Sequence, residues 1–139
     1  MGIRYCMANE ATITTLLGNQ GDPVEYTIAA GAVIPKGTLM EFGTSPQTVV
    51  ISSADGKFFA GIAASESTAA DTFTKLSCIT HCIAEVKNSG AGTLGLPQKL
   101  SGANTVADAD SDTVATATEV VGIGLETAST GTQAILINL

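Results

Sequence analysis

A short apolar phrase occurs twice in this chain, and it decides the fold class. Residues 59–63 read Phe-Ala-Gly-Ile-Ala, and residues 120–124 read Val-Val-Gly-Ile-Gly. The offset is 61, because 122 minus 61 and 123 minus 62 give the same number. Each copy precedes a small, polar stretch and then an apolar run, residues 72–79 or 132–139. Because a solenoid needs three or more repeats, two copies predict one β domain built from two related halves.

A second echo lies upstream of the first. Residues 37–40 read Gly-Thr-Leu-Met and residues 92–95 read Gly-Thr-Leu-Gly, at an offset of 55 (92 minus 37). The second half then needs six additional residues (61 minus 55), which we place in residues 98–118. The predicted pseudo-repeats therefore span about residues 30–87 and 88–139.

From residue 23 onward, short runs of β-type pattern follow one another. Val24, Tyr26 and Ile28 alternate with polar residues, as in a half-buried strand. About ten short strands are predicted between Gly-rich turns: 24–28, 39–42, 47–52, 57–64, 72–79, 81–87, 93–96, 98–100, 119–125 and 132–139. The pattern predicts an all-β, small and compact β-barrel or β-sandwich, as a single domain over residues 23–139. The last strand should pair within the core.

Residues 1–22 differ from the rest and are predicted to be an N-terminal arm. Residues 7–17 could form a short helix, but Thr12, Thr14 and Thr15 are poor helix formers, and a turn cluster follows at residues 18–23. We expect an extended or partly helical arm that leaves the domain. The alternative is an ordinary first strand.

Composition excludes several partners. The 139 residues carry a net charge of −7, and the six basic residues are scattered, which argues against nucleic acid and against an anionic membrane. No apolar run approaches the ~20 residues that span a bilayer, and the N-terminus does not read as a signal peptide. Three cysteines without framework spacing fit reduced thiols and a protein made in a cytosol.

Few residues offer chemistry, so we predict no enzyme and no cofactor. The one histidine, His81, is expected to pack in or at the rim of a strand. Cys78, His81 and Cys82 suggest zinc, but in one strand Cys78 and Cys82 would lie about 13 Å apart with the histidine on the opposite face. Buried free cysteines are the better interpretation. Asp108, Asp110, Asp112 and Glu119 match a calcium loop that lacks its glycine and its helices, so we interpret them as an acidic surface loop.

Several motifs together resemble a known family. They are Met7-Ala-Asn-Glu-Ala, Gly21-Asp-Pro-Val-Glu-Tyr-Thr-Ile, Ala30-Gly-Ala-Val-Ile-Pro-Lys-Gly-Thr-Leu, Phe59-Ala-Gly-Ile-Ala, Lys99-Leu-Ser-Gly-Ala-Asn-Thr-Val and Val120-Val-Gly-Ile-Gly-Leu-Glu-Thr-Ala. In this order they resemble the capsid decoration (cement) proteins of tailed bacteriophages and some archaeal viruses. The resemblance covers nearly the whole chain from Met7, and residues 1–6 lie outside it.

The resemblance implies a structural role on the outer surface of a virion. Such proteins bind the mature icosahedral head, often as trimers at threefold and quasi-threefold positions, and stabilise the major capsid protein subunits. It implies no catalytic, cofactor or metal site. Extended arms and weakly charged interfaces suit this role, so we predict capsid or subunit contacts at Arg4, Tyr5, Ile13, Leu16, Leu17 and Pro35.

Two other classes of function stay open. Residues 30–39 also resemble the turn of small β-clip domains, some of which bind sugars; six aromatic residues in the whole chain make a carbohydrate platform hard to build. The other alternative is a self-assembling fibre or surface subunit, against which the missing signal peptide counts.

Overall fold

The computed structural model describes residues 9–16, 23–54, 57–90, 92–109, 120–128 and 131–139. In these residues the protein is all-β, as predicted, with eleven strands in two sheets and no helix. The strands are β1 (Thr12–Leu16), β2 (Val24–Thr27), β3 (Leu39–Phe42), β4 (Val49–Ile51), β5 (Phe59–Ala63), β6 (Lys75–Ile79), β7 (His81–Asn88), β8 (Pro97–Gly102), β9 (Thr105–Asp108), β10 (Val120–Gly124) and β11 (Gly131–Asn138).

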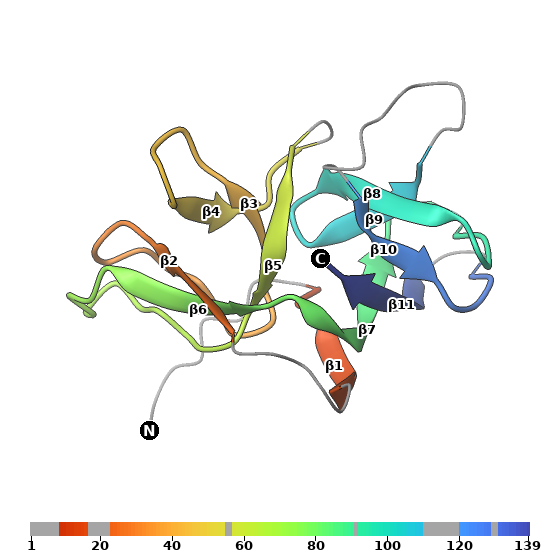
Figure 1. Cartoon of the computed structure of the whole chain (residues 1–139), viewed down its shortest axis with the longest axis horizontal. Helices are drawn as coiled ribbons and strands as arrows, with labels where there is room; N and C mark the ends of the chain where they lie inside the picture. The colour runs from red at the N-terminus through yellow and green to blue at the C-terminus, as the bar shows by residue number, and fades with distance from the viewer. Residues whose placement is uncertain (1–8, 17–22, 55–56, 91, 110–119, 129–130) are drawn as a thin grey trace.

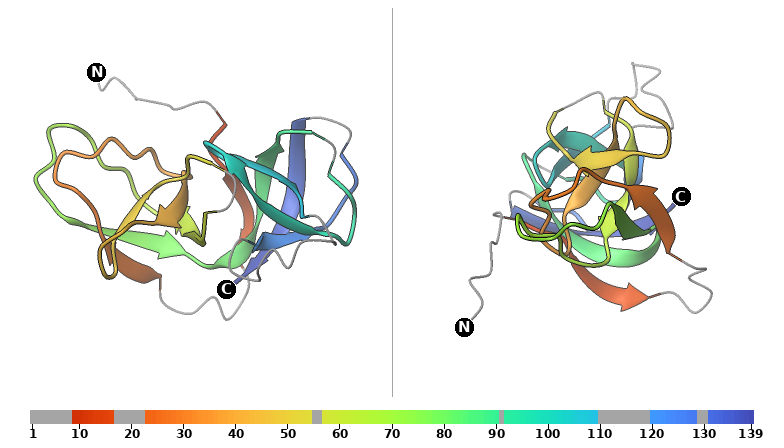
Figure 2. Two further views of the ribbon diagram at one scale, coloured as in Figure 1. Left: turned by 90° about the horizontal axis from the view of Figure 1, so that it is seen from above. Right: turned by 90° about the vertical axis from the view of Figure 1, so that its left-hand side faces the viewer.

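The two sheets divide the chain into two consecutive units. The first sheet has the order β2-β6-β5-β3-β4, and the second has the order β1-β7-β11-β10-β8-β9. A parallel pairing of β7 with β9 closes the second sheet into a small barrel. At the equivalent position of the first sheet there is a single parallel bridge, between Thr27 and Thr48. We call β2–β6 the first unit and β7–β11 the second unit; Figures 1 and 2 show them side by side.

Each strand of the first unit has a counterpart with the same neighbours in the second. Strands β2 to β6 match β7 to β11 in order, because both units pair their strands in the same pattern. The register also repeats: Leu39 pairs with Ile62, and Pro97 pairs with Ile123 at the equivalent place. In both units the register shifts after one further pair, and there β5 and β10 each carry one unpaired residue. The repeat seen in the sequence is therefore a repeat of structure.

The offset of 61 is confirmed, and the offset of 55 is wrong. The Gly-Ile phrase forms β5 and β10. Upstream, however, Gly37 corresponds to Gly95 at an offset of 58 (95 minus 37), since their amides donate to the carbonyls of Ala63 and Gly124. Both glycines have positive φ, 90° and 83°, which requires glycine at this turn. Gly92 matches Gly37 in sequence but not in structural position, because it forms an isolated β-bridge with Ala128.

The corresponding strands span residues 24–79 and 81–138, so the structural repeat begins at β2 rather than near residue 30. The offset rises from 57 at β9 (106 minus 49) to 61 at β10, which leaves four additional residues, not six, between these strands. Two strand assignments also change. Residues 93–96 form a turn rather than a strand, and β9 was not predicted.

Apolar side chains gather in two clusters. The first lies within the first unit and contains Ile28, Ile34, Met40, Val49, Ala60, Ala63, Leu76 and Cys78. The second lies within the second unit and extends to the first; its members are Ala11, Leu39, Phe59, Ile62, Cys82, Ala84, Val86, Leu100, Val106, Val121, Ile135 and Ile137. The second cluster therefore joins the two units.

The described part of the expected arm is a strand of the domain. β1 pairs antiparallel with β7, and the amide of Ala11 donates to the carbonyl of Gly37 at 2.7 Å. Ala11 is buried, and Ile13 packs against the second cluster, so burial of these side chains holds the strand on the sheet. The alternative of a first strand thus applies to residues 12–16.

The final apolar run pairs within the core, as predicted. β11 lies between β7 and β10, and it pairs with β7 over the whole length of both strands. Ile135 and Ile137 are fully buried.

Candidate binding cleft and buried amide cluster

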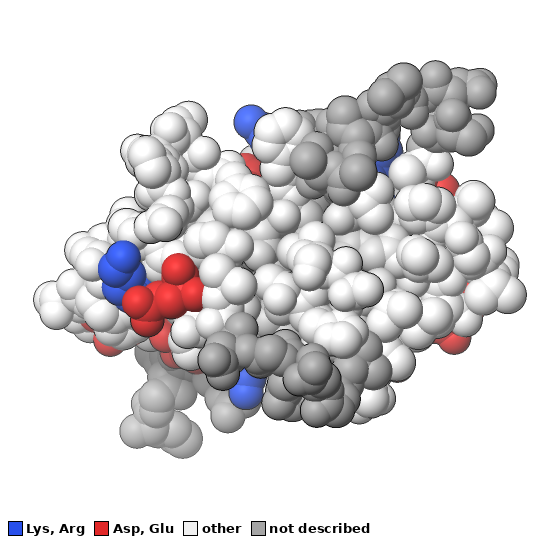
Figure 3. All heavy atoms as spheres, viewed as in Figure 1, with Lys and Arg blue, Asp and Glu red and all other residues white. Residues whose placement is uncertain are grey.

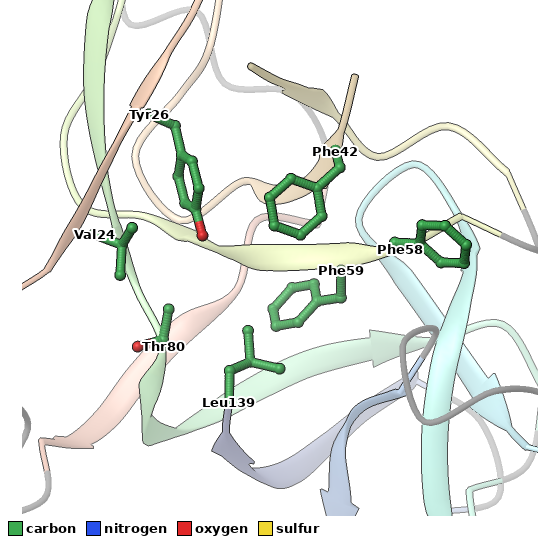
Figure 4. Close-up of a pocket in the computed structure, with 7 residues that line it drawn as sticks. All are labelled: Val24, Tyr26, Phe42, Phe58, Phe59, Thr80 and Leu139. Atoms are coloured by element: carbon green, nitrogen blue, oxygen red, sulfur yellow. The ribbon is translucent and has the colours of Figure 1, made fainter. Parts of the chain in front are cut away.

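An apolar cleft opens at the end of the first unit, next to the second. It has a volume of about 490 Å3, and its lining residues are Val24, Tyr26, Phe42, Phe58, Phe59, Thr80 and Leu139. They come from β2, β3, β5 and the residue before it, the short link between β6 and β7, and the residue after β11. Figure 4 shows Tyr26, Phe42 and Leu139 around the ring of Phe59.

Strand geometry explains how aromatic side chains reach this cleft. On β2, Val24 and Tyr26 alternate with polar residues and therefore point to the same side. The rings of Tyr26 and Phe42 pack edge to face, with centroids 5.5 Å apart and planes at 85°. Phe59 forms the floor and is 3% exposed, whereas Phe42 is 42% exposed. Four of the six aromatic residues of the chain thus line one cleft.

The cleft suits an apolar partner. None of its seven lining side chains is charged. Burial, with a smaller contribution from Cys78, raises the pKa of Tyr26, so its hydroxyl stays neutral at physiological pH. Phe58 and Leu139 are 50% and 56% exposed. Burying apolar surface is worth roughly 25 cal/mol per Å2, so covering these side chains would stabilise a complex.

The predicted contact residues fall in several places. Arg4, Tyr5 and Leu17 lie outside the described residues. Leu16 ends β1 opposite Cys82. Ile13, on β1, is half-buried against the second cluster, and Pro35 is buried in the turn before β3, where its carbonyl accepts a hydrogen bond from the Thr38 hydroxyl at 2.7 Å.

The structure brings β1 and the turn after Pro35 together. A groove of about 700 Å3 lies between them, lined by Ala11, Thr12, Ile13, Thr14, Thr15, Lys36, Gly37, Ala63, Ala64 and Ile79. The side chains of Thr12, Thr14 and Lys36 are exposed. This groove, rather than Pro35 itself, is the accessible surface in this region.

A buried polar cluster fills one end of the second unit. Asn88, Gln98 and Gln133 are at most 2% exposed. The Asn88 Nδ2 donates to Gln133 Oε1 at 2.9 Å and to Gln98 Oε1 at 3.3 Å, and Gln98 Nε2 donates to Asp108 Oδ1 at 2.6 Å. Gln133 Nε2 donates to the carbonyl of Glu126 at 2.8 Å. These bonds satisfy the buried amides, which would otherwise cost stability.

Asp108, one of the four acidic residues of the predicted surface loop, belongs to this cluster. Burial acts to raise its pKa, but hydrogen bonds from Gln98 and Thr93 outweigh burial, so the pKa lies below its ordinary value. The other acidic residues of the proposed loop, Asp110, Asp112 and Glu119, lie outside the described residues.

The two described cysteines are free and buried, as predicted, but they lie in different sheets. Cys78 is on β6 and Cys82 on β7. Burial raises the pKa of Cys78 to about 12 and that of Cys82 to about 11. Both thiols are therefore protonated at neutral pH. His81 is half-buried at the start of β7.

Sequence reasoning missed both features of this section. The cleft residues are distant in the sequence. Each buried amide is a single polar residue in a strand that also has exposed polar residues, so it does not stand out. The available signal was the internal repeat, because each amide replaces an apolar residue of the first unit.

Comparison with known proteins adds no family. No protein-family model matches the chain, and no curated protein matches it. No helix among the described residues is long and apolar enough to cross a membrane.

Proposed function

We propose that this protein is a capsid decoration protein that binds the outer surface of an icosahedral virus head and stabilises contacts between major capsid protein subunits. In this role it is made in the host cytoplasm, joins the virion, and acts as a homotrimer at threefold or quasi-threefold positions. The resemblance of its motifs to that family is one support.

The observation that carries the proposal is the amount of exposed apolar surface on both units. Large apolar side chains are exposed among the described residues at Val24, Val33, Phe42, Val50, Phe58, Phe73, Leu94, Leu96, Ile123, Leu125 and Leu139. The face in Figure 3 carries few charged side chains. Exposed apolar side chains that gather into patches are typical of surfaces that other proteins cover.

Co-sedimentation with expanded phage heads that lack their decoration protein tests the role. We expect saturable binding at a fixed ratio to the major capsid protein. The absence of binding to heads from several tailed phages and archaeal viruses would contradict the proposal.

The groove beside β1 is the expected capsid contact. Thr12→Arg places a long charged side chain in this groove and should weaken sedimentation, whereas Thr44→Arg, in the exposed loop after β3, should not. Removal of residues 1–8 tests the remainder of the predicted arm without deleting β1. Full binding by both altered proteins would move the contact to another surface.

A ligand-binding module is the second candidate, because four aromatic residues line one cleft. Calorimetric titration with oligosaccharides such as cellohexaose and chitohexaose tests it. Binding that is lost in Phe58→Ala but kept in Phe73→Ala would favour the module over the capsid role, because Phe73 is similarly exposed and lies outside the cleft.

A further inference from the structure

Within the chain, one face of the first unit covers the end of the second. Leu39, Phe59 and Ile62 lie on strands of the first unit but belong to the second apolar cluster, and Phe59 also lines the cleft. We call them the closing face of the first unit. A hydrogen bond of 2.9 Å from the Leu39 amide to Asn104 Oδ1 fixes this contact.

The surface under the closing face is an end of the second unit, which we call its receiving end. Its side chains are Ala84, Val86 and Leu100, and all three are fully buried in the same cluster. The receiving end is therefore an apolar surface that a neighbouring unit covers.

The first unit has the same receiving end. Phe59, Thr80 and Leu139 border it, but no strand face among the described residues covers it as the closing face covers the second unit. The strand correspondence equates Ala84, Val86 and Leu100 with Val24, Tyr26 and Phe42. These three residues line the apolar cleft, where Val24 and Phe42 remain exposed.

The second unit likewise has an uncovered closing face. The residues that correspond to Leu39, Phe59 and Ile62 are Pro97, Val120 and Ile123. Pro97 is exposed, Val120 is half-buried, and Ile123 is 46% exposed. Exposed Leu96 and Leu125 adjoin Pro97 and Gly124 in the chain and extend the apolar surface.

We propose that a second copy of this chain covers the cleft. The closing face of the second unit in one copy docks on the receiving end of the first unit in the next, as the two units dock within one chain. This contact joins two different surfaces, so it is head-to-tail, and its repetition gives a ring where the rotation closes and an open filament where it does not.

Side-chain sizes support this partner. Within the chain, the large Phe59 and Leu39 face a receiving end in which two of the three residues, Ala84 and Val86, are smaller, and the third is Leu100. Between copies, the closing face has the smaller side chains and the receiving end has the larger ones. The closing face carries the smaller Val120 and Pro97, and the receiving end carries the larger Tyr26 and Phe42. Apolar interfaces tolerate exchanges that conserve total volume.

The proposal does not rest on capsid binding, because the expected capsid contact is the groove beside β1 and the contact between copies uses other surfaces. If the proposed trimer forms, this contact makes it a ring of six units. Light scattering after size exclusion measures the mass without any capsid, so failure here leaves the sedimentation test of function intact.

Two substitutions and one control test the contact. Phe42→Asp alters the receiving end of the first unit, and Ile123→Asp alters the closing face of the second. Phe73→Asp is the matched control, because Phe73 is 42% exposed, as Phe42 is, and lies outside both surfaces. Val24→Lys serves as a second variant of the receiving end should Phe42→Asp fail to fold by circular dichroism.

We expect the wild type and Phe73→Asp to be oligomers, and Phe42→Asp and Ile123→Asp each to be monomers. Mixing the two monomeric proteins restores one intact contact, so they should form a one-to-one heterodimer that grows no further. A wild type that stays monomeric, variants that keep the wild-type mass, or a mixture that stays monomeric would each overturn the proposal.

Discussion

The two units share a fold and differ in what fills it. At one end of the first unit, the interior positions are apolar; at the same end of the second, they are polar. Four apolar residues, Ile28, Met40, Ile51 and Leu76, correspond to Asn88, Gln98, Asp108 and Gln133. The comparison teaches that strand pairing and register tolerate either interior, provided that every buried polar atom finds a partner.

The opposite ends differ in exposure. The second unit has Ala84, Val86 and Leu100 there, covered by the first unit. The first unit has two aromatic residues and a valine, open to solvent. The same fold therefore provides a covered end and an uncovered end within one chain.

The largest expected effect comes from a glycine that both units require. A Cβ on Gly122 would overlap the carbonyl oxygen of Leu136, and backbone cannot move aside as a side chain can. We expect Gly122→Ala to lower the free energy of unfolding by about 3 kcal/mol or more. Gly90→Ala is the control, since nothing lies within 4 Å of its Cβ. Equal urea midpoints for the two proteins would contradict this close approach.

The next effect tests the amide cluster against its apolar counterpart. Gln133→Leu restores the residue type of the first unit but removes an acceptor from buried Asn88. We expect a loss of about 1–3 kcal/mol.

The triple variant Asn88→Ile, Gln98→Met and Gln133→Leu reproduces the apolar interior at these positions. It should lose less than the sum of its three single variants, because none of the three side-chain amides is left without its partners. Urea unfolding of all four proteins checks this, and additive losses would show that the amides act independently.

A smaller effect should appear as a pH dependence in the second unit. The folded-state pKa of Asp108 is lowered, so its carboxylate stabilises the fold above the unfolded pKa, about 4 for an aspartate. That stability is lost as pH falls through the folded pKa. The stability difference between wild type and Asp108→Asn should therefore be greatest near neutral pH and shrink in acid. A difference that grows in acid would reverse the sign of the pKa shift.

The smallest effect is expected at the thiols. Because burial raises the pKa of both Cys78 and Cys82, neither should react with iodoacetamide in the native protein at neutral pH. Peptide mapping by mass spectrometry at increasing urea then reports each unit separately. Labelling of Cys78 before Cys82 would show that the first unit opens first, and simultaneous labelling would show that the two unfold together.

The sequence predicted local structure well where the signal was periodic. Val24 and Tyr26 alternate with polar residues, and β2 follows. The repeated Gly-Ile phrase forms equivalent strands because the chain passes close to a neighbouring strand there. The upstream offset was wrong because it aligned Gly37 with Gly92 on sequence identity alone. The residue that shares the positive φ of Gly37 is Gly95.

The candidate cleft could not be predicted in the same way. Tyr26, Phe42 and Phe58 lie on or beside different strands, and only sheet order brings them together. β1 was expected within an arm because its threonines are poor helix formers and a turn cluster follows it. Contacts of Ala11 and Ile13 with distant residues hold it on the sheet.

By itself, the sequence determined the all-β class, the internal repeat, the buried cysteines and the pairing of the last strand. These follow from spacing and side-chain type, which act over a few residues. Only the tertiary structure decided that the repeat makes two five-stranded units, that the second has a polar interior, and that one apolar end is left uncovered. Those features depend on which distant strands pair, and the free energy of pairing depends on the whole sheet rather than on a few neighbouring residues.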